Sequence, residues 1–321
     1  MFDLKNKDGK KKNFASNQIL FIFCFWVFMC IIFGAFSKHF FTLQNFLAIT
    51  IQASVIAMLA AGQTFVILSA GIGLDAGSVV ALSAVISAMV MAATGSIFLG
   101  FLAGLVTGGL TGVVNGFVIG KLGLPPFVAT LGMMQVARGI ALIITGGVPV
   151  YELLNGSDVL GQGRFLGIPV STIVVFLLFL LCSFILTRTR RGRYTYAVGS
   201  NPEATFLSGI NVKKQIVWIY AIAGVTAGLA GLAEMSRVGS GQPGCGVGYE
   251  LDAIAAVVLG GISMTGGVGN IWGSLLGALI IATMRNGLNV INVNAYWQQV
   301  AIGIIIVATV YSDTVRNNID K

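Results

Sequence analysis

Two stretches of the chain, residues 42–74 and 87–120, contain no charged side chain at all. A helix needs ~20 consecutive mainly apolar residues to cross the hydrocarbon core of a bilayer, so each stretch is long enough to cross it. The whole chain is 56% hydrophobic and 9% charged, whereas a typical soluble domain is about 25% charged. It also has no polar block large enough for a separate soluble domain. The sequence therefore predicts an all-α, polytopic membrane protein.

The apolar segments predict roughly ten membrane spans. We place them at residues 19–36, 46–69, 78–94, 97–120, 126–145, 169–187, 216–235, 251–262, 271–290 and 294–312. The segment 251–262 is too short to cross alone, so the alternative is nine spans plus a re-entrant segment. We expect the first span to be kept, because its apolar run exceeds the ~7–15 residues of a cleaved signal peptide.

Glycine is abundant, with 43 of 321 residues, and it recurs at a spacing of four. One series runs from Gly104 through Gly108 and Gly112 to Gly116, and a second pair is Gly224 and Gly228. Small residues four apart lie on one face of a helix and let two backbones approach closely inside lipid. We expect these two segments to be helices that pack tightly, as in a transporter.

The net charge of +8 comes from basic residues that concentrate on one side of the predicted membrane domain. With the N-terminus inside and ten crossings, most basic residues lie on the cytoplasmic side, as the positive-inside rule requires. These are Lys5, Lys7, Lys10, Lys11, Lys12, Lys121, Arg188, Arg190, Arg191, Arg193, Lys213, Lys214, Arg316 and Lys321. The predicted organisation is a cytoplasmic N-terminal segment (1–18), a transmembrane domain (19–312) with a cytoplasmic segment at 188–215, and a cytoplasmic tail (313–321). The basic excess therefore does not indicate nucleic-acid binding.

The two halves of the chain contain a similar glycine-rich break. Residues 71–77 read GIGLDAG and residues 261–267 read GISMTGG. Transporters often build a polar path from internal repeats with broken helices, because unwound backbone is tolerated only where it lines a cavity or packs within protein. These breaks make Gly71, Asp75, Gly77, Gly261 and Gly267 candidates for a translocation path or gate. The alternative is that both are ordinary glycine-rich turns.

Motifs for chemistry are missing from the sequence. Gly120 and Lys121 are followed by Leu122, so there is no phosphate-binding loop, and no metal or nucleophile motif is present. We therefore expect no enzyme activity and no cofactor on this chain. Few ionisable residues are candidates for a proton relay: Arg138, Glu234 and Arg285 lie within predicted spans and Asp75 lies in the first break, and their carboxylates form no obvious pair. This favours energy from a partner over an ion-gradient-driven secondary carrier, which remains the alternative beside a non-transporting scaffold.

The polar segment between two spans contains a short helix with clear end signals. Asn201 is suited to cap the helix, Pro202 to its first position and Glu203 to its positive end. Gly209 predicts the end of the helix, with Ile210 as an apolar contact just beyond it. A helix so delimited outside the membrane either docks into a partner or lies on the lipid headgroups.

Two long motifs, "GRYTYAVGSNPEATFLSGINVKKQ" (192–215) and "GVGYELDAIAAVVLGGISMTGGVGNIWGSLLGALI" (246–280), resemble the permease subunits of bacterial ABC importers for monosaccharides, the ribose-type family. Residues 127–139 and 286–299 are similar to it as well. The resemblance implies the permease fold, a coupling helix at residues 201–211 and no ATPase motif on this chain. The coupling candidates are Asn201, Glu203, Ala204, Leu207, Ser208, Gly209 and Ile210.

The same resemblance implies a set of partners and a location. The partners are a cytoplasmic ABC ATPase that binds ATP-Mg, a periplasmic or lipid-anchored sugar-binding protein, and a second copy or a sister permease. The location is the bacterial inner membrane. The substrate is ribose or a related pentose or hexose. Docking candidates for the binding protein lie in the predicted outer loops 146–168 and 236–250, namely Glu152, Asp158, Arg164 and Arg237.

The first break departs from the family pattern. The family usually shows Gly-Ile-Asp-Leu-Ser-Val-Gly-Ser, whereas this chain has Gly73 where the acid is expected and Asp75 two places later. Two positions are about 200° of rotation on a helix, so Asp75 does not replace the missing carboxylate face for face.

A sugar path needs partners for hydroxyl groups. Polar candidates within the spans are Gln63, Asn115, Gln135, Asn286 and Asn289, with the aromatic Phe65, Phe127 and Trp297. The alternative for each polar residue is a hydrogen bond between helices, worth about 0.6 kcal/mol on average in a membrane.

Overall fold

The computed structural model describes residues 5–151, 153–294, 296–304, 307 and 311, with the backbone alone for residues 5–18. Within them the fold is all-α apart from one short hairpin, as predicted. The elements are α1 (Lys5–Phe36), α2 (Leu43–Leu68), α3 (Ala76–Thr94), α4 (Ile97–Gly120), α5 (Pro126–Thr145), η1 (Ser157–Val159), β1 (Arg164–Phe165), β2 (Ile168–Pro169), α6 (Val170–Arg188), α7 (Arg190–Ser200), α8 (Pro202–Leu207), α9 (Val212–Val238), α10 (Tyr249–Leu259) and α11 (Ile271–Val290).

Eight of the described helices are long and apolar enough to cross a membrane, namely α1 (over Ile19–Phe36), α2, α3, α4, α5, α6, α9 and α11. They coincide with eight predicted spans. The short predicted span 251–262 is α10, whose 11 residues extend only about 16 Å against a hydrocarbon core of about 30 Å. The last predicted span, 294–312, is helical over 296–304 and otherwise falls largely outside the described residues, as does the tail 313–321.

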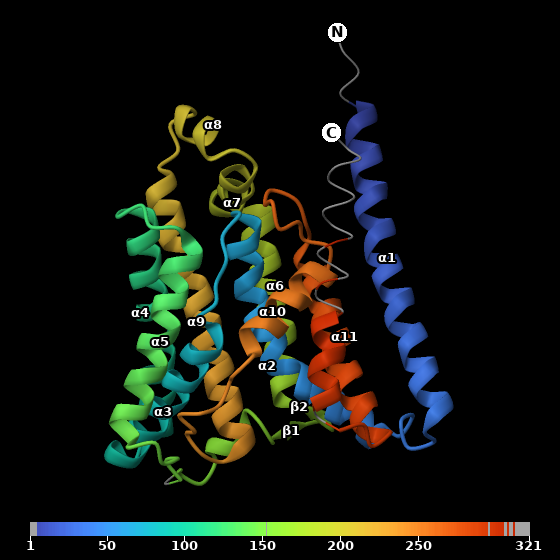
Figure 1. Cartoon of the computed structure of the whole chain (residues 1–321), viewed down its shortest axis with the longest axis vertical. Helices are drawn as coiled ribbons and strands as arrows, with labels where there is room; N and C mark the ends of the chain where they lie inside the picture. Colours follow the sequence, from blue (N-terminus) through green and yellow to red (C-terminus); the bar gives the residue numbers. More distant parts are fainter. Residues whose placement is uncertain (1–4, 152, 295, 305–306, 308–310, 312–321) are drawn as a thin grey trace.

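Helix α2 lies inside the bundle, with 89% of its most apolar window buried. It packs against α9, α10 and α11, while α1 lies at the edge of the molecule beside α11 (Figure 1). Helix α8 lies at one end of the bundle and the hairpin β1–β2 lies at the other (Figure 1). The bundle therefore has two distinct ends, and the long helices α2, α9 and α11 connect them.

The predicted glycine series joins α4 to α9. A Cβ added to Gly108 would lie 2.7 Å from the Cα of Gly228, and one added to Gly112 would lie 3.0 Å from the Cα of Gly224. Side chains other than hydrogen cannot fit between backbones this close, which is the packing mode expected for membrane helices. The prediction of tight packing between these two segments is confirmed.

Both glycine-rich breaks are non-helical connections that begin with the same helix end. After α2 the amide of Ala70 donates to the carbonyl three residues back and that of Gly71 to the carbonyl five residues back. After α10, Gly261 and Ile262 make the same two bonds. This is a Schellman end, with Ala70 (φ 59°) and Gly261 (φ 80°) in the left-handed conformation. The structural correspondence is thus displaced by one residue from the sequence correspondence, which pairs Gly71 with Gly261.

Candidate translocation and coupling sites

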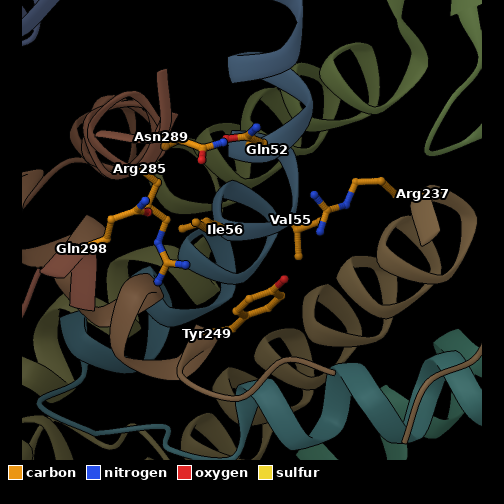
Figure 2. A pocket seen from close by; sticks show the side chains of 9 residues that line it. Gln52, Val55, Ile56, Arg237, Tyr249, Arg285, Asn289 and Gln298 are labelled. Atoms are coloured by element: carbon orange, nitrogen blue, oxygen red, sulfur yellow. The ribbon is translucent and has the colours of Figure 1, made fainter. Parts of the chain in front are cut away.

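A polar cavity of about 330 Å³ lies between several helices (Figure 2). Its lining includes Arg237 in the last turn of α9, and α9 runs from α8 toward the opposite end of the bundle (Figure 1). The cavity is enclosed by the first half of α2, the last turn of α9, the start of α10 and the second half of α11. Its lining residues are Gln52, Val55, Ile56, Arg237, Tyr249, Ala282, Arg285, Asn289 and Gln298. We call it the outer cavity. Cavities of this size are typical of small-molecule sites.

Both arginines of the outer cavity are held by buried acids. The Nη2 atom of Arg285 lies 2.6 Å from Oδ2 of Asp252, which is 1% exposed. The Nη2 atom of Arg237 lies 2.7 Å from Oε2 of Glu234. The hydroxyl of Tyr249 donates to the Oε1 atom of Glu234 at 3.3 Å. Since each guanidinium is paired with a carboxylate, the wall of the cavity offers many polar atoms and no net charge.

Three predicted path residues meet in a tightly packed cluster around the first break. The side-chain amide of Asn115 donates to Oδ2 of Asp75 at 2.8 Å, and that of Gln63 donates to the carbonyl oxygen of Gly73 at 2.7 Å. The hydroxyl of Tyr220 donates to the carbonyl oxygen of Ile72 at 3.3 Å. The cavity beside them measures about 10 Å³, which is room for one water molecule. In this conformation the cluster braces the break and leaves no space for a sugar.

The remaining path candidates lie in several different places in the fold. Asn289 lines the outer cavity, and Asn286 is buried one turn earlier on α11. Gly77 packs against the loop before α10, because a Cβ there would clash with the carbonyl oxygen of Gly246. A Cβ on Gly71 would lie 2.7 Å from the hydroxyl of Tyr220. Gln135 is exposed on α5, away from both the cavity and the cluster.

The second break is fastened to α7 and to the end of α2. The amide of Gly267 donates to the carbonyl oxygen of Leu68 at 2.9 Å, and the hydroxyl of Tyr196 donates to that of Gly269 at 3.0 Å. A Cβ on Gly199 would clash with the carbonyl oxygen of Leu68 and lie 2.7 Å from the amide of Gly267. Helix α7 therefore contacts the second break and the end of α2 just before the first break, at the end of the bundle that carries α8.

The short helix predicted from residue 201 is α8, and its end signals are confirmed. The Asn201 side chain accepts a hydrogen bond from the amide of Ala204 at 2.9 Å, and Gly209 has a φ of 80° just after the helix. Phe206 and Leu207 are 68% and 80% exposed at the tip of the molecule (Figure 1). Glu203, Ser208 and Ile210 lie around the same tip, with Ile210 half-buried. Two large apolar side chains thus protrude, and no element among the described residues covers them.

The candidates for docking a binding protein lie at the opposite end, with one change. Asp158 in η1 and Arg164 in β1 are exposed, and Glu152 lies outside the described residues. Arg237 was predicted in a loop at 236–250, but α9 continues through Val238, so Arg237 is helical and paired with Glu234. The loop prediction failed because no glycine or proline lies between Gly231 and Gly239, so the helix continues until Gly239, whose φ is 74°.

Sequence reasoning missed several residues of the sites. Gln52, Tyr249 and Gln298 line the outer cavity, and Asp252 pairs with Arg285. The sequence contained evidence for the Asp252–Arg285 ion pair. An acid inside one apolar segment and a base inside another are each costly in a membrane unless they pair. Helix α7 was also missed, since its glycine and serine residues are poor helix formers in isolation.

A bundle of apolar helices with a polar cavity, broken helices and a protruding helix at one end defines a membrane transport subunit. The sequence profile of the family described as "Branched-chain amino acid transport system / permease component" matches residues 45–310. The chain belongs to this family.

Individual relatives are permeases named for sugars. The ribose import permease protein RbsC of Escherichia coli (strain K12) is 42% identical over 281 residues, which cover 86% of this chain and 88% of that protein. In the same organism, the D-allose transport system permease protein AlsC is 39% identical over 284 residues (88% and 87%). The L-arabinose transport system permease protein AraH is 36% identical over 295 residues (92% and 87%). No solved structure matches the chain.

The chain is therefore the permease component of an ABC importer, and the ATPase is a separate subunit. The prediction of an ATP-driven transport subunit is confirmed. The ion-gradient-driven carrier and the non-transporting scaffold are set aside, because the relatives are permease components of import systems.

Proposed function

We propose that this protein forms the membrane path of an importer for a neutral monosaccharide, ribose or a related pentose or hexose. The observation that carries the proposal is the 36–42% identity, over most of the chain, to permeases named for three different sugars. The outer cavity supports it, because amide, hydroxyl and guanidinium groups together offer both donors and acceptors to sugar hydroxyls.

The path that we propose begins at the outer cavity and is closed by the two breaks. Asn289 lines the outer cavity and offers its amide to a sugar hydroxyl, and Asn286 lies one turn deeper on α11. The cluster of Gln63, Asp75 and Asn115 keeps the first break closed. Gly71, Gly77 and Gly267 permit the close contacts of the closed state, and Gly261 ends α10 in the left-handed conformation.

Coupling to ATP hydrolysis is assigned to α8 and its flanking residues, Asn201 to Ile210. Phe206 and Leu207 provide an apolar anchor that fits a cleft in a cytoplasmic ATPase. The ATPase, and not this chain, binds ATP-Mg. Since α7 contacts Gly267 in the second break and Leu68 at the end of α2, a displacement of α8 reaches the second break directly and the first break through the end of α2. The segment 188–215 is thus the coupling segment of the transmembrane domain.

The proposed orientation of the chain in the membrane follows from the side on which the coupling segment lies. If α8 is cytoplasmic, both termini are cytoplasmic and the hairpin end faces the periplasm of a bacterial inner-membrane protein. Asp158 and Arg164 then meet a periplasmic or lipid-anchored sugar-binding protein. A second copy or a sister permease completes the path, and the long lipid-facing helices complete the contact with the bilayer.

Uptake by cells that express the chain with its importer partners tests the substrate class. We expect accumulation of at least one labelled neutral monosaccharide among ribose, allose and arabinose, and no accumulation of leucine or valine. The measurement is initial uptake rate, with each unlabelled solute as competitor. Uptake of a branched-chain amino acid with no uptake of any sugar would overturn the proposed function.

A further inference from the structure

The charge balance of the outer cavity carries a further inference, which rests on the proposed function. We propose that the outer cavity is a sugar-accepting subsite within each copy of the chain, and that Asp252 and Glu234 determine its specificity. By neutralising the two arginines, these acids restrict the subsite to uncharged polyols. Sugar acids and zwitterionic amino acids are excluded.

The arrangement of the side chains supports a polyol. Figure 2 shows the guanidinium groups of Arg237 and Arg285 entering the cavity from opposite sides, with the ring of Tyr249 between them. Their side chains are 31% and 37% exposed, so each guanidinium is engaged by its acid and still accessible. A guanidinium has five N–H donors, and in the described part of the chain Arg285 donates to Asp252 through Nη2 alone. The Nε atom of Arg285 is buried, so the donors that remain for ligand hydroxyls are the Nη1 group and the second N–H of Nη2.

Acceptors and further donors come from uncharged amides. Gln52, Asn289 and Gln298 each carry an amide oxygen and an amide nitrogen. Gln298 donates to the carbonyl oxygen of Val293 at 3.0 Å, which orients its amide. A sugar hydroxyl both donates and accepts, so this mixture of groups suits a polyol better than a pure acceptor such as a carboxylate.

The two buried acids explain the exclusion of charged solutes. A carboxylate ligand meets guanidinium groups whose charge is already neutralised by an acid, so it gains a strong charge interaction only by drawing a guanidinium away from that acid. Asp252 is 1% exposed and Glu234 is 5% exposed, so the acid left behind would be a buried charge without its ion-pair partner. That state is strongly unfavourable. An ammonium ligand meets the same obstacle, because both acids are already occupied by arginines.

The test uses Asp252→Asn, which releases Arg285 from its carboxylate. The full-length chain is purified in nanodiscs, and saturation-transfer NMR is measured with D-ribose, D-ribonate and L-leucine as probes. We expect the wild type to bind ribose and to give no signal with ribonate or leucine. Asp252→Asn should bind ribonate at least tenfold more tightly than the wild type does, because a free guanidinium now faces the cavity.

Two further variants keep the result interpretable. The double variant Asp252→Asn/Arg285→Gln restores neutrality and should lose ribonate binding again, which separates a charge effect from a disturbed fold. Glu250→Gln removes an acid from the same helix outside the cavity and should behave as the wild type. Ribonate binding by the wild type, no gain in Asp252→Asn, or no ribose binding at all would overturn the subsite. If the subsite fails this test but cells import a sugar, the proposed function still holds. Uptake of amino acids alone would overturn the proposed function itself.

Discussion

Gly112→Leu is expected to prevent the chain from accumulating as a folded membrane protein. A Cβ at this position would clash with the carbonyl oxygen of Tyr220 and lie 3.0 Å from the Cα of Gly224. The obstacle is backbone on both sides, so α4 and α9 would have to separate. Overpacking a core costs about 1–3 kcal/mol where side chains adjust, and we expect more here because no side chain can move aside.

The measurement is the yield of monodisperse protein in mild detergent and its thermal unfolding midpoint. Gly132→Leu is the matched control, since a Cβ at Gly132 on α5 meets nothing within 4 Å. It should leave yield and midpoint unchanged. Equal behaviour of the two variants would show that the contact of α4 with α9 does not hold the bundle together.

Gly199→Val is expected to abolish transport with the protein still inserted in the membrane. The valine side chain would push α7 away from the carbonyl oxygen of Leu68 and the amide of Gly267. Because these contacts tie the coupling segment to the second break and to the end of α2 before the first break, motion of α8 would no longer reach the breaks. We expect uptake to fall by at least tenfold, while the variant still co-purifies with the ATPase.

Gly244→Val is the control for this variant, because a Cβ at Gly244 meets nothing within 4 Å in the loop between α9 and α10. Its uptake should match the wild type. Normal uptake by Gly199→Val would contradict a mechanical role for the contact between α7 and the breaks, and loss of ATPase binding would assign Gly199 to docking instead.

The sequence predicted those features that depend on residues close together in the chain. The capping of α8 by Asn201 and its end at Gly209 follow from side chains within one helical turn. The spans follow from local hydrophobicity. The packing of α4 on α9 was also predictable, because the spacing of glycines marks one face of each helix without reference to the rest of the fold.

The features that escaped prediction depend on contacts between distant segments. Asp252 and Arg285 are 33 positions apart on different helices, and the outer cavity is assembled from four helices and the segment after α11. The partner of Asp75, the acid that departs from the family pattern, also escaped prediction, because only the fold shows that Asp75 meets Asn115 on α4. The one-residue displacement of the two breaks depends on Ala70 adopting a left-handed conformation, which a sequence pattern assigns to glycine.

ATP-driven accumulation of sugar in proteoliposomes tests the account most directly. The vesicles contain the chain with its ATPase, and the sugar-binding protein is added on the side that carries Arg164. We expect labelled sugar to accumulate only when ATP is supplied on the side of α8. The double variant Phe206→Asp/Leu207→Asp, whose side chains are exposed in the isolated chain, should keep its fold and lose both ATPase binding and accumulation. Accumulation without ATP, or undiminished accumulation by the double variant, would contradict the account.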